Sequence, residues 1–208
     1  VDQRNHGDSP WHDSHSYPDM AADLAAVIDA NGGRADVVGH SMGGKAAMVL
    51  ALAHPEKVAR LVVADIAPVG YSHDQTQYID AMQSVDLGAV TKRADASEQL
   101  ARQVEDKVLQ SFFTQSLDIA AKRWKLNLEV LKREMDKIVG FPEVSGRFEG
   151  PTLFLSGALS DYVLPEHRPV IRAHFPKARF ARLAQAGHWL HAEKPREFEA
   201  SLRAFLDA

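Results

Sequence analysis

The 208-residue chain contains no cysteine. This absence excludes disulfide bonds, thiol catalysis and cysteine-ligated zinc sites, and it fits a reducing or an oxidising compartment. No apolar run approaches the roughly 20 residues that a membrane-spanning helix needs, and no signal peptide opens the chain. We therefore expect a soluble, cytoplasmic protein that does not act at a membrane.

The chain also lacks a strong excess of charge. Its formal net charge is −4, and its basic residues are spread along the sequence. Such a distribution gives no electrostatic footprint for nucleic acid or for an anionic membrane. The length suffices for one hydrophobic core with room for an inserted lid. The expected partner is therefore a small, neutral molecule.

The most informative pattern is Gly39-His-Ser-Met-Gly43. A short β-branched run precedes it, and an alanine-rich helical stretch, 45–53, follows at once. This context is typical of a nucleophile elbow, in which a serine stands on a sharp turn between a strand and a helix. The pattern predicts that Ser41 is exposed at the turn, and that Gly39 and Gly43 lack side chains so that the backbones can pass.

Strand and helix signals alternate on both sides of a helical insertion. Mixed apolar spacing predicts helices at 16–31, 45–54, 165–174 and 195–206, and apolar runs predict strands at 37–38, 58–66, 152–157 and 179–183. This alternation predicts an α/β fold with a mostly parallel sheet and flanking helices. We expect the core to comprise residues 1–70 and 149–208. The strand at Val37-Val38 is expected to be buried.

The insertion, residues 71–148, carries charged amphipathic helix patterns at 74–85, 97–113 and 117–138 and has no strand signal. We expect it to form a helical cap over the carboxyl edge of the sheet. Its large apolar residues Phe112, Phe113 and Trp124 are candidates for lining the substrate pocket, although most such residues serve a domain's own core.

A serine hydroxyl becomes a good nucleophile only when a base takes its proton and an acid orients that base. His188 follows the last predicted strand, at the sheet edge where active sites collect, and is the expected base. His40, beside the serine, is expected to point elsewhere. His12, Asp13 and His15 lack further ligands at metal-site spacing, so no metal or organic cofactor is predicted.

Two aspartates are candidates for the acid, because both end apolar strands between the serine and the histidine. Asp65 lies at the end of the strand at 58–66, and Asp161 follows Ser156-Gly157 in the loop where most hydrolases of this design carry the acid. A buried Asp65 needs an imidazolium partner or backbone donors. Spacing alone leaves the two nearly even.

Several longer motifs point the same way. They are Asp2-x-Arg-Asn-His-Gly7, Gly39-His-Ser-Met-Gly-Gly44, Val63-x-Asp-Ile-Ala-Pro68, Trp124-x-x-Asn-Leu128 and Gly187-His-Trp-x-His-x-Glu-x-Pro195. Together they resemble the α/β-hydrolase superfamily and, within it, the YbfF-type esterases. The resemblance covers the whole chain and implies that Asp65, the aspartate of the Asp-Ile-Ala-Pro segment, is the acid ahead of Asp161.

The resemblance also implies that further strands, and a His-Gly turn supplying half of the oxyanion hole, precede the point where the sequence begins. We therefore expect an upstream N-terminal segment of the same protein as a partner. The amide of Met42, at the start of the helix behind the serine, would be the other half of the oxyanion hole.

These observations predict a serine hydrolase that cleaves small to medium acyl esters through an acyl-enzyme. A thioesterase, a lactonase or a carbon–carbon hydrolase would use the same three residues, Ser41, His188 and an aspartate. The alternative from another class is a non-catalytic binding protein on a hydrolase scaffold.

Overall fold

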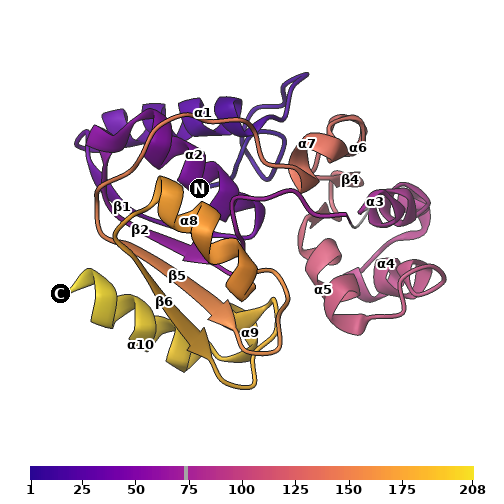
Figure 1. Ribbon diagram of the computed structural model, residues 1–208. Helices are drawn as coiled ribbons and strands as arrows, with labels where there is room; N and C mark the ends of the chain where they lie inside the picture. Colours follow the sequence, from indigo (N-terminus) through magenta and orange to yellow (C-terminus); the bar gives the residue numbers. More distant parts are fainter. Residues whose placement is uncertain (73–74) are drawn as a thin grey trace. The chain divides into compact units, whose positions relative to one another are not determined.

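The computed structural model describes residues 1–72 and 75–208, so the predicted helix start at Asp74 lies outside the described residues. The chain divides into two compact units (Figure 1). The sheet unit comprises residues 17–70 and 140–208, and the helical unit comprises residues 1–16 and 71–139. The N-terminal 16 residues therefore group with the insertion, whereas the sequence pattern had assigned them to the core.

The sheet unit contains a parallel sheet. In the described residues its strand order is β1-β2-β5-β6, formed by β1 (Ala35–His40), β2 (Val58–Ala64), β5 (Thr152–Gly157) and β6 (Ala178–Leu183). The predicted α/β class is confirmed. Because all four strands run the same way, their carboxyl ends lie at one edge of the sheet.

The predicted helices of the sheet unit are present with shifts of a few residues. They are α1 (Tyr17–Ala30), α2 (Met42–Ala53), α8 (Arg168–His174) and α10 (Pro195–Leu206), together with α9 (Leu190–Glu193) and the short 3-10 turns at Pro55–Lys57 and Pro165–His167. No helix in the described part of the chain combines the length and apolar character needed to cross a membrane.

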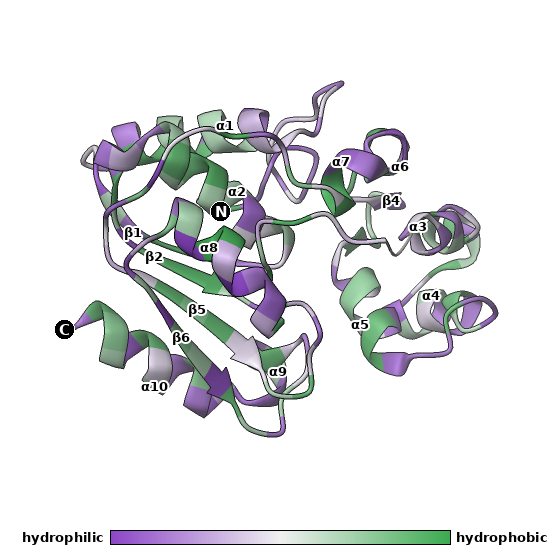
Figure 2. Cartoon of the chain, in the orientation of Figure 1, coloured by the Kyte–Doolittle hydropathy of each residue, from purple (hydrophilic) through white to green (hydrophobic). Residues whose placement is uncertain are grey.

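The two faces of the sheet bury different helices. Val62 and Ala64 of β2 pack in one cluster with Phe205 of α10. Side chains alternate along a strand, so Val63 faces the opposite side, where it approaches Gly44 of α2. The inner strands β2 and β5 are correspondingly apolar along most of their length (Figure 2).

The outer strand β1 differs from the expectation of a buried strand. Val38 is 44% exposed, and the burial of β1 alternates along its length. Val38 is exposed because β1 lies at the border of the described sheet and has β2 as its strand partner on one side.

The helical unit contains short helices around its own apolar cluster. The helices are α3 (Thr76–Gln83), α4 (Arg93–Leu100), α5 (Lys107–Gln115), α6 (Leu128–Arg133) and α7 (Met135–Val139), with a 3-10 turn at Leu87–Ala89. One helix was predicted over 97–113. The structure has two in its place, and the Asp106 carboxylate caps the second by accepting the Val108 amide at 2.7 Å.

The prediction of one helix over 117–138 is wrong. A small antiparallel ladder, β3 (Leu117–Asp118) with β4 (Arg123–Trp124), comes before α6. Its turn contains Lys122 in the left-handed backbone region, with φ of 52°, and the Asp118 carboxylate accepts the Ala121 amide at 3.0 Å. Turn chemistry of this kind outweighs the apolar spacing that favours a helix.

The motif around Asn5 lies in the helical unit and contacts the Trp124–Leu128 motif. The Asn127 backbone amide donates to the Asn5 carbonyl at 3.0 Å, and the Asn127 side-chain amide donates to Asn5 Oδ1 at 3.1 Å. Asn5 is fully buried with a φ of 64°, a conformation that asparagine tolerates better than most residues. Two of the motifs that carry the family resemblance therefore form one structural element.

Candidate active site

Ser41 occupies a sharp turn between β1 and α2. Its backbone has a φ of 52° and a ψ of −121°, an unusual conformation for a residue with a side chain. The turn is held in place because the Ser41 amide donates to the Ala64 carbonyl of β2 at 3.0 Å. The sequence therefore identified the turn and its strand and helix context correctly.

The close approach at this turn involves Gly39 and Gly44 more than Gly43. A Cβ atom at Gly39 would lie 2.3 Å from the Gly43 carbonyl oxygen, and one at Gly44 would lie 2.6 Å from Ile66 Cγ2. A Cβ atom at Gly43 would meet no atom within 4 Å. The requirement for a bare backbone at Gly43 was therefore wrong, because the backbone carbonyl of Gly43, not its Cα substituent, faces Gly39.

Asp65 lies directly after β2 and is fully buried. Its amide donates to the Leu155 carbonyl at 2.9 Å, and its φ of 50° lies in the left-handed backbone region. One carboxylate oxygen, Oδ1, accepts the Gly157 amide of the neighbouring strand at 2.9 Å. The end of β5 thus fixes the side chain that ends β2.

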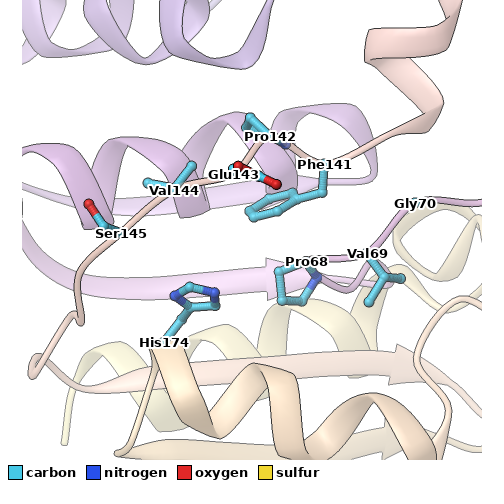
Figure 3. A pocket seen from close by; sticks show the side chains of 9 residues that line it. All are labelled: Pro68, Val69, Gly70, Phe141, Pro142, Glu143, Val144, Ser145 and His174. Carbon is cyan, nitrogen blue, oxygen red and sulfur yellow. The ribbon is translucent and has the colours of Figure 1, made fainter.

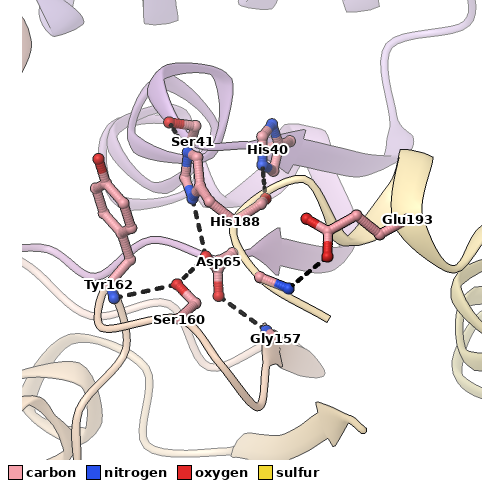
Figure 4. A network of polar contacts seen from close by, with 9 residues as sticks. His40, Ser41, Asp65, Gly157, Ser160, Tyr162, His188 and Glu193 are labelled. Carbon is pink, nitrogen blue, oxygen red and sulfur yellow. Dashed lines mark hydrogen bonds and ion pairs between the residues drawn. The ribbon is translucent and has the colours of Figure 1, made fainter. Parts of the chain in front are cut away.

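His188 lies between Asp65 and Ser41 (Figure 4). Its Nδ1 is 2.8 Å from Asp65 Oδ2, and its Nε2 is 3.0 Å from Ser41 Oγ. Since an ionised carboxylate only accepts hydrogen bonds, Nδ1 carries the proton, and Nε2 is left to accept the serine hydroxyl. This is the relative order that general-base activation of a serine requires.

The loop after β5 contributes two contacts that the sequence analysis missed. The Ser160 hydroxyl donates to Asp65 Oδ2, and the Tyr162 ring stacks on the His188 imidazole with centroids 4.1 Å apart. Asp161, between them, is exposed. The loop in which hydrolases of this design commonly carry the acid therefore supports Asp65 here. Serine and tyrosine at alternate positions of a loop carried no recognisable signal.

His40 does not point away from the site. Its Nε2 is 2.8 Å from the His188 carbonyl oxygen, and its ring centroid is 4.7 Å from that of His188 and 4.6 Å from that of His191. Burial, followed by the neighbouring His188, lowers the pKa of His40 to about 4. Burial also lowers the pKa of His191. His40 is therefore a neutral imidazole at neutral pH.

Lys45, one turn along α2 from Ser41, is buried at 1% exposure. Its Nζ donates to the Gly140 carbonyl at 2.5 Å, and the Tyr17 ring centroid lies 5.7 Å away. Burial lowers the pKa of Lys45 to about 8. This burial could not be predicted from the sequence, because lysine is rarely fully enclosed.

The sheet unit also has a hollow of about 630 Å³, shown in Figure 3. It is lined by Pro68 to Gly70, by residues 141–145 and by His174. Its lining includes none of Ser41, Asp65 or His188. The hollow therefore shares no lining residue with the polar network of Figure 4.

The other predicted site residues, Met42 and the three aromatic residues of the cap, differ in burial and in the unit to which they belong. Met42 begins α2, so its amide stands at the positive end of the helix. Phe113 and Trp124 belong to the apolar cluster of the helical unit, whereas Phe112 is 46% exposed. Among the residues that the structure describes, no group of three or more His, Asp or Glu side chains is arranged to hold a metal ion.

Comparison with known proteins gives a consistent result. Residues 1–195 match the model of the alpha/beta hydrolase fold family. The chain is 41% identical over 215 residues to the sn-1-specific diacylglycerol lipase ABHD11 of Mus musculus, covering 99% of this chain and 70% of that protein. It is 37% identical over 212 residues to Esterase YbfF of Escherichia coli K12, covering 100% of this chain and 81% of that protein.

A solved structure, described as a marine microorganism esterase, matches with a TM-score of 0.92 and 36% identity. The match covers 99% of this chain and 83% of that one. The resemblance to YbfF-type esterases noted from the motifs is therefore confirmed. With a family match over nearly its whole length and relatives above 30% identity, the chain belongs to the alpha/beta hydrolase fold family.

Proposed function

We propose that the protein is an ester hydrolase in which Ser41, His188 and Asp65 form a catalytic triad. The observation that carries the proposal is the imidazole of His188, which is within hydrogen-bond distance of Asp65 Oδ2 on one side and Ser41 Oγ on the other. Relatives named as an esterase and as a diacylglycerol lipase support ester hydrolysis as the reaction class.

The first step is attack of Ser41 Oγ on the ester carbonyl carbon. His188 Nε2 takes the hydroxyl proton as the new carbon–oxygen bond forms, and Asp65 stabilises the resulting imidazolium through Nδ1–H. The carbonyl oxygen becomes an oxyanion. The Met42 amide, at the N-terminal end of α2, is a donor suited to that charge.

Collapse of the tetrahedral intermediate breaks the bond to the alcohol oxygen. The imidazolium returns its proton to that oxygen, so the alcohol leaves and an acyl-serine remains. Water then attacks the acyl carbon, again with His188 as the base, and the carboxylic acid is released. One proton is taken and returned in each half-reaction, so His188 and Ser41 are regenerated.

Buried contacts hold Asp65 ready for this role. Its Oδ1 accepts the Gly157 amide, and its Oδ2 is shared between Ser160 and His188. A buried carboxylate with these donors keeps its orientation, and it therefore holds the His188 ring in the tautomer that leaves Nε2 open for the serine proton.

We propose small to medium acyl esters as the substrates and residues 71–148 as the cap that sets the acyl preference. The chemistry resides in the sheet unit, whereas large apolar side chains such as Phe112 belong to the helical unit. This division suits an enzyme in which one segment performs the reaction and another selects the acyl group.

A fluorophosphonate probe, which reacts with activated serines, tests the proposal together with p-nitrophenyl acetate hydrolysis. We expect labelling at Ser41 and a loss of turnover of about 10⁴- to 10⁶-fold in Ser41→Ala and in His188→Ala. Ser201→Ala, which changes a serine on α10, is the control and should keep wild-type turnover. Near-normal turnover in folded Ser41→Ala would refute the mechanism.

A further inference from the structure

Two hydrogen bonds hold the backbone on either side of the His188 side chain. The Gly187 amide donates to Glu193 Oε2 at 2.8 Å. The carbonyl of His188 itself accepts from His40 Nε2, also at 2.8 Å (Figure 4). One bond therefore holds the peptide group between residues 186 and 187, and the other holds the peptide group between residues 188 and 189.

The His40 ring fits closely against the loop that it holds. Its centroid lies 4.7 Å from the His188 ring, 5.7 Å from the Trp189 ring and 4.6 Å from the His191 ring. His40 is the last residue of β1, directly before Ser41. The strand end that carries the nucleophile thus also contacts the loop that carries the base.

We propose that His40 and Glu193 are positioning residues, which clamp the 187–188 backbone so that the His188 imidazole stays between Ser41 and Asp65. The inference rests on the proposed function. Asp65 orients the ring of His188, but this orientation places the ring correctly only if the main chain of His188 keeps a fixed position. A displacement of about 1 Å at a reacting group can lower a rate about 10²-fold.

The neutrality of His40 suits this task. A carbonyl oxygen accepts, so His40 Nε2 carries the proton and donates it as an uncharged imidazole. A cationic donor in the same place would stand beside the imidazolium that forms on His188 during proton transfer, and it would oppose that charge. His40 therefore supplies the hydrogen bond without a second positive charge.

Paired substitutions at each clamp residue test the inference on p-nitrophenyl acetate. His40→Phe keeps a ring and removes the donor, whereas His40→Gln keeps an amide donor at a similar reach. We expect His40→Phe to lower kcat about 10- to 100-fold, with KM within about threefold of wild type. His40→Gln should recover most of kcat. His54→Phe, at the far end of α2, is the matched control and should behave as wild type.

Glu193 provides a second pair in case His40→Phe does not fold. Glu193→Gln keeps an acceptor for the Gly187 amide, and Glu193→Met removes it. We expect a loss of kcat in Glu193→Met and near-normal kcat in Glu193→Gln. A folded His40→Phe or Glu193→Met protein with wild-type kcat would overturn the clamp. Wild type and Ser41→Ala are assayed beside them, so a wild-type protein without ester turnover would instead refute the proposed function, and the clamp with it.

Discussion

The amide of Gly157 donates to Asp65 Oδ1 at 2.9 Å, so the last residue of β5 holds the side chain that follows β2. The two strands are paired in register from Leu61 with Thr152 to Ala64 with Leu155. Because the donor is a main-chain amide, substituting another side chain at residue 157 does not in itself remove it. The orientation of Asp65 is therefore tied to the sheet itself.

We expect Asp65→Asn to lower ester turnover about 10⁴-fold, because an amide at this position disfavours the tautomer with the proton on His188 Nδ1. Asp161→Asn is the matched control, since Asp161 is exposed in the same loop as Ser160. Steady-state kinetics on p-nitrophenyl acetate measure both. If Asp161→Asn lost more activity than Asp65→Asn, the acid would have to be reassigned.

The glycines around Ser41 should differ in their tolerance of a methyl group. Gly39→Ala places a Cβ atom 2.3 Å from the Gly43 carbonyl oxygen, so the turn must shift, and both the melting temperature and the labelling of Ser41 should fall. Gly43→Ala meets no atom within 4 Å and should keep a melting temperature close to wild type. Equal melting temperatures for the two variants would contradict the packing described for the turn.

Lys45 predicts a dependence of stability on alkaline pH. Its pKa is lowered to about 8 from an ordinary value of 10.5, so between these values the folded state binds fewer protons than the unfolded state. Stability from this group therefore rises with pH across that window and is constant below it. We expect the melting temperature of wild type relative to Lys45→Met to increase between pH 8 and 10.5.

The control for this measurement is Lys177→Met, which changes an exposed lysine. Its melting temperature relative to wild type should stay constant over the same pH range. If the difference in melting temperature between wild type and Lys45→Met did not change with pH, the pKa of Lys45 would be the same in the folded and unfolded states.

Two aromatic residues of the helical unit should affect different properties. Trp124 is buried, and its Nε1–H donates to the Met82 carbonyl at 3.0 Å, so Trp124→Ala should cost about 3–5 kcal/mol of stability. Phe112→Ala should leave the melting temperature nearly unchanged, because Phe112 is 46% exposed.

If Phe112 lines the acyl site, Phe112→Ala should change the ranking of p-nitrophenyl esters by chain length and leave the acetate ester much less affected. A uniform loss over all chain lengths, at an unchanged melting temperature, would remove Phe112 from the set of substrate-binding residues.

The sequence predicted the sheet, its main helices and the serine turn, because strand and helix periodicities are strong over such segments. It could not separate Asp65 from Asp161 by spacing. Each follows an apolar strand, and these strands, β2 and β5, are neighbours in the parallel sheet, so their carboxyl ends lie side by side. The family resemblance favoured Asp65, and the side-chain contact of Asp65 with His188 agrees with it.

Other features escaped the sequence for equally physical reasons. The contact of His40 with His188 joins residues 148 positions apart, and local periodicity carries no information on such pairs. The ladder of β3 and β4 has two residues in each strand, too few to produce an alternating pattern. Lys45 lies among small and apolar residues of α2, and full burial of a lysine is rare enough that sequence alone does not predict it.

The division of the chain into units has a consequence for recombining this protein with its relatives. The helical unit is built from residues 1–16 and 71–139, and Asn5 in the first segment bonds Asn127 in the second through both backbone and side chain. In a chimera that exchanged residues 71–139 alone, Asn5 would face the corresponding residues of the homologue instead of its own Asn127. The two segments of the helical unit would have to be exchanged together, with crossovers that include positions near residues 16, 70 and 139.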